Sequence, residues 1–306
     1  MVPPYARMRG APRAGRRGRT SKAQAAEIRP ARQTTPTEGP RVAVRRIGAA
    51  DRVALRGHWF DQHRTGPMSL DARVRRLNAR FRGRPAAAVM EHALTAMGRV
   101  AVVSSFGADS AVLLHMAARV DPRAPVLLVD TGRLFPETLD YRDALVARLG
   151  LEALEIVRPD PERLRAVDPD DRLYHAHPDA CCALRKTEPL QAALSHFDGW
   201  ITGRKRYQSA TRAGLQLFEV ERPPEAPARI KVNPLAPWTA DDVAHYIAAY
   251  ALPQHPLVAR GYPSIGCHPC TAPVGPGEDP RAGRWKGQAK EECGIHVVDG
   301  KVVRGG

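Results

Sequence analysis

All five cysteines of this 306-residue sequence lie in the second half of the chain, in a pattern that separates four of them from the fifth. Cys181 and Cys182 are adjacent, and Cys267 and Cys270 form a C-x-x-C pair. Thiolates paired in this way can hold either a four-thiolate zinc ion or an iron-sulfur cluster. Cys293 lies outside both pairs, so its thiol is the candidate for a nucleophile.

The adjacent pair also predicts where Cys181 and Cys182 lie within a helix. Two neighbouring cysteines that bind one centre must point the same way, whereas neighbouring side chains in the middle of an α-helix diverge by about 100°. We therefore expect Cys181 and Cys182 at a helix end. No secretory signal and no apolar run of membrane-spanning length are present, so we predict a cytoplasmic protein with no membrane partner and with reduced cysteines.

Positive charge is concentrated at the start of the chain. The formal net charge is +15 at pH 7, and residues 1–50 hold twelve Lys and Arg against two acids. This segment lacks apolar periodicity and cannot bury enough surface to offset the entropy of ordering. We predict a disordered basic tail over residues 1–50, which could be an RNA-binding arm, a transit-like peptide or a plain tail. Residues 51–85 are predicted to form a helical lead-in.

From residue 86 onward, short apolar strands alternate with helical patterns. The sequence predicts strands within 100–106, 125–130, 154–157 and 200–203, and helices within 111–118, 136–149 and 241–250, the last with Thr239 as its N-cap. Such alternation is typical of an α/β domain with a parallel sheet, whose ligand site lies at the carboxyl ends of the strands.

Two further features at predicted strand ends favour an anionic ligand. The turn 104–110 combines small residues with a following helix N-terminus, which suits close approach of a phosphate or sulfate, although it lacks the Gly-Lys-Ser/Thr ending of a Walker A loop. Cations gather at Arg185-Lys186, along residues 203–212, and at Arg281 and Arg284 before Cys293.

Taken in order, these motifs resemble the assimilatory, thioredoxin-dependent adenylyl-sulfate (APS) reductases within the wider phosphoadenylyl-sulfate and adenylyl-sulfate reductase family. The resemblance spans about residues 86–298 and rests on the segments 104–110, 130–138, 181–186, 203–212, 231–236, 266–271 and 292–296. The loop 203–212 departs from the family pattern in reading Arg-Lys-Arg-Tyr-Gln, and residues 1–50 lie outside the resemblance.

The resemblance implies an adenine-nucleotide α-hydrolase-like (Rossmann-like) α/β domain over residues 86–255, followed by a C-terminal catalytic segment over residues 256–306. It implies one 4Fe-4S cluster on Cys181, Cys182, Cys267 and Cys270, and this cysteine set accompanies use of adenosine 5'-phosphosulfate. It further implies that Cys293 is catalytic and that the substrate contacts Ser104, Phe106, Gly107, Asp109, Ser110, Thr131, Gly132, Arg133, Lys186, Arg212, Arg281, Arg284 and His296.

The expected reaction is reduction of adenosine 5'-phosphosulfate to sulfite and AMP. Cys293 attacks the substrate sulfur and becomes an S-sulfo-cysteine, from which thioredoxin, a separate protein, releases sulfite. Lys290, Arg284 and His296 are the nearby candidates in sequence for holding the Cys293 thiolate, and His296 could instead cap or pack.

Other functions stay open at this point. The chain could reduce the 3'-phosphorylated nucleotide, or both nucleotides. Two other classes are an iron-sulfur enzyme of tRNA sulfur transfer and a non-enzymatic zinc and nucleic-acid-binding module. The reductase interpretation expects no nucleic-acid partner, and it leaves the oligomeric state open.

Overall fold

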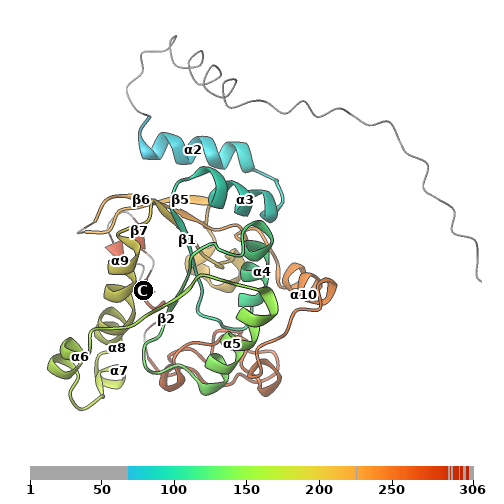
Figure 1. Ribbon diagram of the computed structural model, residues 1–306. Helices are drawn as coiled ribbons and strands as arrows, with labels where there is room; N and C mark the ends of the chain where they lie inside the picture. Colours follow the sequence, from blue (N-terminus) through green and yellow to red (C-terminus); the bar gives the residue numbers. More distant parts are fainter. Residues whose placement is uncertain are drawn as a thin grey trace, which may run out of the picture. The chain divides into compact units, whose positions relative to one another are not determined.

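A six-stranded sheet organises the described part of the chain (Figure 1). The computed structural model describes residues 68–224, 226–288, 290, 292–295, 297–298 and 301–302. The strand order is β3-β2-β1-β4-β6-β5, and all neighbours pair in parallel except the edge strand β5, which is antiparallel to β6. The strands are β1 (Val100–Val103), β2 (Val126–Val129), β3 (Leu154–Val157), β4 (Gly199–Ile201), β5 (Phe218–Glu221) and β6 (Arg229–Val232).

The predicted α/β class is therefore confirmed, with one antiparallel edge strand that the sequence did not indicate. From β1 the chain adds β2 and β3 on one side, then returns to place β4 and β6 on the other. The order reverses between β1 and β4, and in open parallel sheets the crevice at such a reversal is where ligands bind. The first strand is shorter than the predicted range 100–106. Strand β1 ends at Val103, and residues 104–106 already belong to the turn.

Helices cover both faces of the sheet (Figure 1). The π-helical turn η1 (Ala183–Thr187) directly follows Cys182, and the 3-10 turn η5 (His268–Cys270) includes Cys270. Further 3-10 turns are η2 (Arg206–Gln208), η3 (Ala210–Arg212) and η4 (Val258–Arg260). The α-helices are α2 (Leu70–Phe81), α3 (Ala86–Ala96), α4 (Ser110–Val120), α5 (Pro136–Leu149), α6 (Pro161–Val167), α7 (Leu173–Ala176), α8 (Pro178–Cys182), α9 (Glu188–Leu194) and α10 (Ala240–Ala249).

Local sequence signals explain where two of the predicted helices begin and end. Helix α5 starts with Pro136, whose fixed φ suits the first turn, and ends at Gly150, which takes a left-handed φ of 64°. Helix α10 starts at a capping box in which the side chains of Thr239 and Asp242 bond to each other's backbone N–H. Both predicted helices and the predicted N-cap are confirmed.

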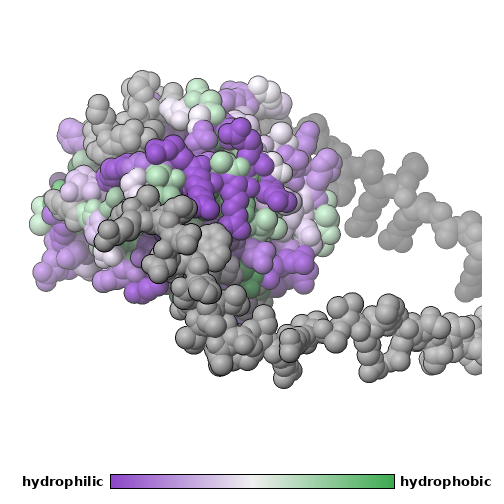
Figure 2. All heavy atoms as spheres, turned by 90° about the horizontal axis from the view of Figure 1, so that it is seen from above, coloured by the Kyte–Doolittle hydropathy of each residue, from purple (hydrophilic) through white to green (hydrophobic). Residues whose placement is uncertain are grey.

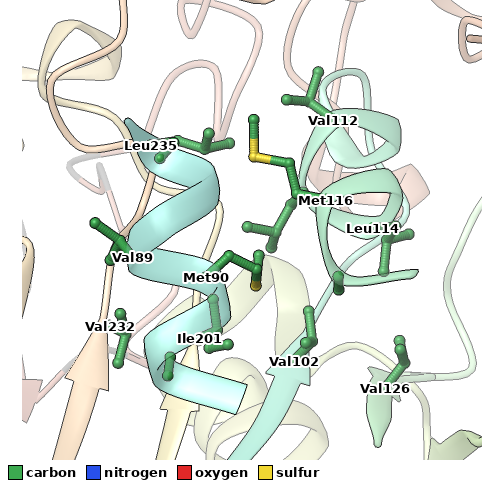
Figure 3. Close-up of a cluster of buried hydrophobic side chains, with 14 of the residues drawn as sticks. Val89, Met90, Val102, Val112, Leu114, Met116, Val126, Ile201, Val232 and Leu235 are labelled. Carbon is green, nitrogen blue, oxygen red and sulfur yellow. The ribbon is translucent and has the colours of Figure 1, made fainter. Parts of the chain in front are cut away.

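The larger core lies between one face of the sheet and helices α3 and α4. Figure 3 shows Val89 and Met90 of α3 and Leu114 of α4 with their side chains among the strand residues Val102, Val126, Ile201 and Val232. These side chains are essentially removed from water. Each contributes about 1.5–3 kcal/mol by burial, which holds the strand ends in fixed positions.

The second core lies on the opposite face, against α9. Leu190 and Leu194 of α9 pack on Leu127 and Trp200, and Ile295 from the end of the chain joins them. The Trp200 indole N–H donates to Glu221 Oε2 at 2.8 Å, so its one polar atom is satisfied although the ring is fully buried. Packing of Ile295 in this core brings the residues around Cys293 to the sheet.

The chain after α10 continues without long helices. A two-stranded hairpin, β7 (Val297–Val298) and β8 (Lys301–Val302), lies near its end. Within the described ranges, no helix is long and apolar enough to cross a membrane. Seen from the side on which α2 lies, the surface is mainly hydrophilic (Figure 2).

The described residues belong to one compact unit, Thr65–Gly306, and the predicted boundaries at residues 51, 86 and 256 stay predictions. The predicted disordered tail lies outside the described residues.

Candidate active site

The four paired cysteines line one small cavity at the carboxyl end of the sheet. Cys181 and Cys182 come from α8, and Cys267 and Cys270 come from the C-terminal segment. The cavity is about 20 Å³, and its wall also includes Thr131, Arg133, Tyr174, Pro178, Arg185 and Lys186. All five cysteines are free thiols. Residues about 85 positions apart in sequence thus converge as the spacing predicted.

A π-helical turn shapes the half of the cavity that α8 supplies. Helix α8 begins at Pro178 and ends at Cys182, but the backbone continues through the π-helical η1 into α9. The expected helix end is therefore a change of helix type rather than a stop. Single π turns inside α-helices occur frequently at functional sites, because the extra residue redirects side chains. Here the turn carries Lys186 toward the thiols.

The C-x-x-C half is attached to the loop that follows β2. Cys267 forms an antiparallel bridge with Leu134, and the His268 N–H donates to the Arg133 carbonyl at 2.8 Å. Thr131 Oγ1 lies 3.3 Å from Cys267 Sγ. The backbone of this loop, rather than a distant scaffold, therefore sets the distance between the two cysteine pairs.

The thiols of the cavity differ in acidity because their surroundings differ. Burial raises the pKa of Cys181 to about 11 and that of Cys182 to about 12, and burial also raises the pKa of Cys270. Burial acts in the same direction on Cys267, but the Lys186 ammonium and the Thr131 hydroxyl outweigh it and lower its pKa. Cys267 is thus the most readily ionised of the four.

Lys186 stands among thiols from both halves of the site. Burial alone would lower the pKa of its ammonium, but the neighbouring Cys267, Cys293 and Cys182 raise it. The ammonium therefore stays charged and faces the candidate nucleophile as well as the cavity. The preceding residue is differently placed, because Arg185 Nη2 contacts Asp168 at 2.8 Å and Asp171 at 2.6 Å.

Cys293 lies beside this cavity in a turn held from both sides. The preceding residue, Glu292, pairs with Arg212, and Ile295 packs in the second core. Gly294 takes a φ of 76°, a left-handed conformation that favours glycine. Lys186 and Arg281 lie within electrostatic reach of Cys293, because its charge acts on the pKa of both side chains.

The cations expected from sequence to hold the Cys293 thiolate are placed differently. Lys290 forms an ion pair with Asp179 and lies 5.4 Å from the centre of the Trp285 ring. The Arg284 guanidinium lies 4.6 Å from the centre of the same ring and acts electrostatically on Cys267 and Cys270. His296 lies outside the described residues. Lys290 also acts electrostatically on Cys182, and the predicted role of these three residues toward Cys293 stays a prediction.

The turn after β1 takes a strained path toward the helix that follows. Phe106 is fully buried with a φ of 49°, rare for a residue with a side chain, and its N–H donates to Ser104 Oγ at 3.2 Å. A Cβ on Gly107 would lie 3.4 Å from the Ile265 carbonyl, so the C-terminal segment passes close to this turn. Ser110 is the first residue of α4.

Asp109 joins this turn to the loop after β4. Although Asp109 is the N-cap of α4, its carboxylate makes no cap bond and instead contacts Lys205 Nζ at 2.8 Å. The Tyr207 hydroxyl donates to the same oxygen at 3.5 Å. The Lys205 side chain is 1% exposed and the Asp109 side chain is 31% exposed, so this pair is a partly buried link across the strand-order reversal. Lys205 lies in the cationic run 203–212 noted in the sequence, but it was not among the residues predicted to contact substrate.

The loop after β2 contains a glycine with a left-handed backbone and, directly after it, an arginine. Gly132 takes a φ of 71°, and its N–H donates to Asp130 Oδ1 at 3.0 Å. Arg133 donates to the Asp171 carbonyl at 2.8 Å, and its guanidinium lies 4.5 Å from the centre of the Tyr174 ring. Arg133 is therefore held in the wall of the cysteine cavity, with Thr131 beside it.

The loop 203–212 meets the segment before Cys293. Arg212 donates from Nε and Nη2 to the two oxygens of Glu292 at 2.7 and 2.8 Å. Arg281 Nη2 lies 3.7 Å from Glu292 Oε2. Two cations predicted to contact substrate, Arg212 and Arg281, are thus gathered here on one acid, Glu292.

Comparison with known proteins places this arrangement in a family. The sequence matches the phosphoadenosine phosphosulfate reductase domain over residues 99–273, from the start of β1 through both C-x-x-C cysteines, which is more than half of the chain. The chain belongs to the phosphoadenosine phosphosulfate reductase domain family. The predicted resemblance is confirmed at this level.

Two relatives and one solved structure show how far this reductase family likeness extends. The adenosine 5'-phosphosulfate reductase of Mesorhizobium japonicum is 55% identical over 65% of this chain and 76% of that protein. The adenosine 5'-phosphosulfate reductase of Chelativorans sp. is 50% identical over 76% of this chain and 94% of that protein. The phosphoadenylyl-sulfate reductase of Candida auris, crystallised as a phosphate complex, is 27% identical with a TM-score of 0.57 over 67% of this chain and 98% of its own.

Proposed function

We propose that this chain reduces adenosine 5'-phosphosulfate to sulfite and AMP, with thioredoxin as the thiol donor. The observation that carries the proposal is the position of Cys293, apart from the two cysteine pairs but within electrostatic reach of Lys186 and Arg281. The names of the two bacterial relatives support this substrate. We place the reaction in the cytoplasm, where thiols are kept reduced.

In the first step, Cys293 is the nucleophile. Its thiolate attacks the sulfur of the phosphosulfate, so a bond forms between the Cys293 sulfur and the substrate sulfur. The bond between that sulfur and the bridging oxygen breaks, and AMP leaves with the electron pair. A thiolate suits this displacement because it is a soft nucleophile that ionises near neutral pH when cations lie nearby.

In the second step, a thioredoxin thiolate attacks the sulfur of Cys293. Sulfite leaves with the electron pair of the S–S bond, and a mixed disulfide joins the two proteins. The second thioredoxin thiol then displaces Cys293, which returns as a thiol. The two electrons that reduce the sulfonate to sulfite come from the thioredoxin dithiol, so the protein's own thiols end unchanged.

Fixed cations around the reacting atoms would lower the barrier. Negative charge grows on the bridging oxygen as AMP departs, and cations already aimed at that region stabilise the transition state more than the ground state. We assign this role to Lys186 and Arg281, which act on Cys293, with Arg284 beside the cysteine cavity. The turn 104–110 and the residues Thr131, Gly132 and Arg133 are proposed to hold the nucleotide.

We propose a 4Fe-4S cluster on Cys181, Cys182, Cys267 and Cys270. Four free thiols surround one cavity. Within the described residues, no three His, Cys, Asp or Glu side chains close around a single metal ion. Four thiolates are the usual ligand set of a 4Fe-4S cluster. When bound, the cluster would supply a compact negative charge beside Lys186, which matches the charged state of that ammonium.

Sulfite formation under anaerobic conditions tests the function. The protein is incubated with reduced thioredoxin and, in parallel, with adenosine 5'-phosphosulfate or its 3'-phosphorylated form. We expect sulfite and AMP from the first nucleotide, and none from a Cys293→Ser variant that still binds it. Sulfite from the 3'-phosphorylated nucleotide alone would favour the other reductase activity. Absence of sulfite from both, with salt-dependent tRNA binding, would favour tRNA sulfur transfer.

A further inference from the structure

The carboxylate of Glu292 lies in a cage of cations and hydroxyls. Arg212 donates to both of its oxygens, at 2.7 and 2.8 Å. The hydroxyls of Ser209 and Thr211 lie 2.8 Å from each other and 3.4 Å from Oε1, so one donates to its neighbour and the other to Oε1, and Arg281 Nη2 lies 3.7 Å from Oε2. We call Ser209, Thr211, Arg212 and Arg281 the anion cage. The carboxylate thus lies among polar atoms of four side chains, more than a surface ion pair offers.

The Arg212–Glu292 pair at the centre of the anion cage is buried, and the carboxylate is ionised. The side chains of Arg212 and Glu292 are 10% and 3% exposed. Burial alone would raise the pKa of Glu292, but the hydrogen bonds and charge of Arg212 outweigh it and lower the pKa. A buried pair of this kind resists separation unless another anion takes the place of the carboxylate, because an unpaired buried charge is costly.

The donors of the anion cage match a phosphate or sulfate group as well as a carboxylate. A guanidinium binds two oxygens of either group through the same pair of N–H bonds, and hydroxyls add further donors. The cage also stands on the loop after β4, at the carboxyl edge of the sheet beside the strand-order reversal. Arg212 is therefore within the region where the proposed substrate must place its phosphosulfate.

We propose that Glu292 is a latch that competes with the substrate for the anion cage. In the nucleotide-free protein its carboxylate fills the cage, and the phosphosulfate oxygens of the bound nucleotide displace it. This inference rests on the proposed function and deepens it. Since Glu292 directly precedes Cys293, departure of the carboxylate from the cage removes the anchor next to the nucleophile. Arrival of the substrate is thereby coupled to release of the Cys293 turn.

The second anchor limits how far that release extends. Ile295 stays packed with Leu190, Leu194 and Trp200 after Glu292 leaves, because those contacts do not involve the anion cage. Only Cys293 and Gly294 separate the two anchors, so opening of the latch gives the nucleophile a short, local movement. Glu292 is in this sense a positioning residue that acts through Arg212.

The competition has a measurable size. When a binding site is free in only a fraction of molecules, the apparent Kd rises by the reciprocal of that fraction. A cage filled in about 90–99% of molecules weakens apparent substrate binding by about 10- to 100-fold. Removal of the Glu292 carboxylate should therefore lower the apparent Kd by a factor of that order.

The experiment measures binding of adenosine 5'-phosphosulfate by calorimetry to the full-length, cluster-loaded protein carrying Cys293→Ser, which prevents turnover. Adding Glu292→Gln should lower the Kd by about tenfold. Adding Glu292→Asp keeps the charge and a partner for Arg212 but shortens the reach, and should lower the Kd by about threefold. Glu278→Gln removes an exposed carboxylate of the same segment and should leave the Kd unchanged.

The aspartate variant separates a latch from simple charge repulsion. If Glu292→Gln tightens binding and Glu292→Asp does not, the effect is loss of a negative charge and the latch is wrong. Weaker binding by both variants would also overturn it, because Glu292 would then hold the site open for substrate. Failure of the Cys293→Ser parent to bind the nucleotide contradicts the proposed function itself, whereas normal parental binding with no gain in either variant contradicts the latch alone.

Discussion

Acidification should weaken the fold through His255, a buried histidine that joins α5 to the C-terminal segment. The Leu257 N–H donates to Nδ1 at 3.2 Å, so the ring proton is on Nε2, which lies 3.0 Å from Thr138 Oγ1 and donates to it. The ring is 1% exposed and packs 4.9 Å from the Tyr141 ring. Burial lowers the pKa of His255 to about 4, although the nearby Glu137 carboxylate acts the other way.

The sign and size of the effect follow from the two pKa values. In the unfolded chain His255 has its ordinary pKa of 6.5, and in the folded protein the value is about 4. Between these pH values the unfolded chain binds a proton that the folded protein does not, so the free energy of unfolding falls as the pH falls. The contribution is fully present above pH 6.5 and is lost by about pH 4, at about 1.4 kcal/mol per pH unit and about 3 kcal/mol in all.

Guanidinium unfolding at a series of pH values checks this prediction. A His255→Gln variant lacks the titrating ring and loses the hydrogen bond from Leu257, so it should be about 1–2 kcal/mol less stable near neutral pH. Its stability should then fall less steeply with acid, so that the difference from the parent shrinks below pH 6.5 and reverses at low pH. His245→Gln removes an exposed histidine of α10 and serves as the matched control. Parent and His255→Gln curves that stay parallel from neutral pH to pH 4 would refute the reasoning.

Three further predictions concern the site and its supports. Gly266→Ala should displace the Arg284 guanidinium, which occupies the space of the added Cβ, and the proposed cluster in the cysteine cavity should then lose iron several-fold faster to a chelator than in the parent. Lys205→Met removes the ion-pair partner of Asp109 and leaves it only the Tyr207 hydroxyl at 3.5 Å, so the KM for the nucleotide should rise about tenfold or more in steady-state assays while the far-ultraviolet circular dichroism is unchanged. Thr239→Ala removes the N-cap of α10 and should cost about 1 kcal/mol in urea unfolding with the KM unchanged.

Features encoded within short segments could be predicted from the sequence. The apolar runs located β2, β3 and β4 to within a few residues, and Pro136 and Thr239 marked the starts of two helices. The paired cysteines indicated a shared site, because thiolates at these spacings can bind one metal centre. The helix-type change at Cys182 was not predictable, since a π turn depends on packing of the helix around it rather than on local propensity.

Contacts between distant loops could not be read from the sequence. Lys205 meets Asp109 from 96 residues away, and Arg212 meets Glu292 from 80 residues away. Their pairing depends on which strand ends stand side by side, which only the strand order decides. The same limit applies to Lys290, which is near Cys293 in sequence but pairs with a residue 111 positions away.

The central claim is that one thiol receives the sulfonate while the paired thiols do not. Mass spectrometry of peptides, after anaerobic incubation of the protein with adenosine 5'-phosphosulfate and no thioredoxin, tests it directly. The account predicts a sulfonate on Cys293 in an amount equal to the AMP released, and its loss as sulfite when thioredoxin is added. A sulfonate on one of the paired cysteines, or AMP release with no adduct on Cys293, would contradict it.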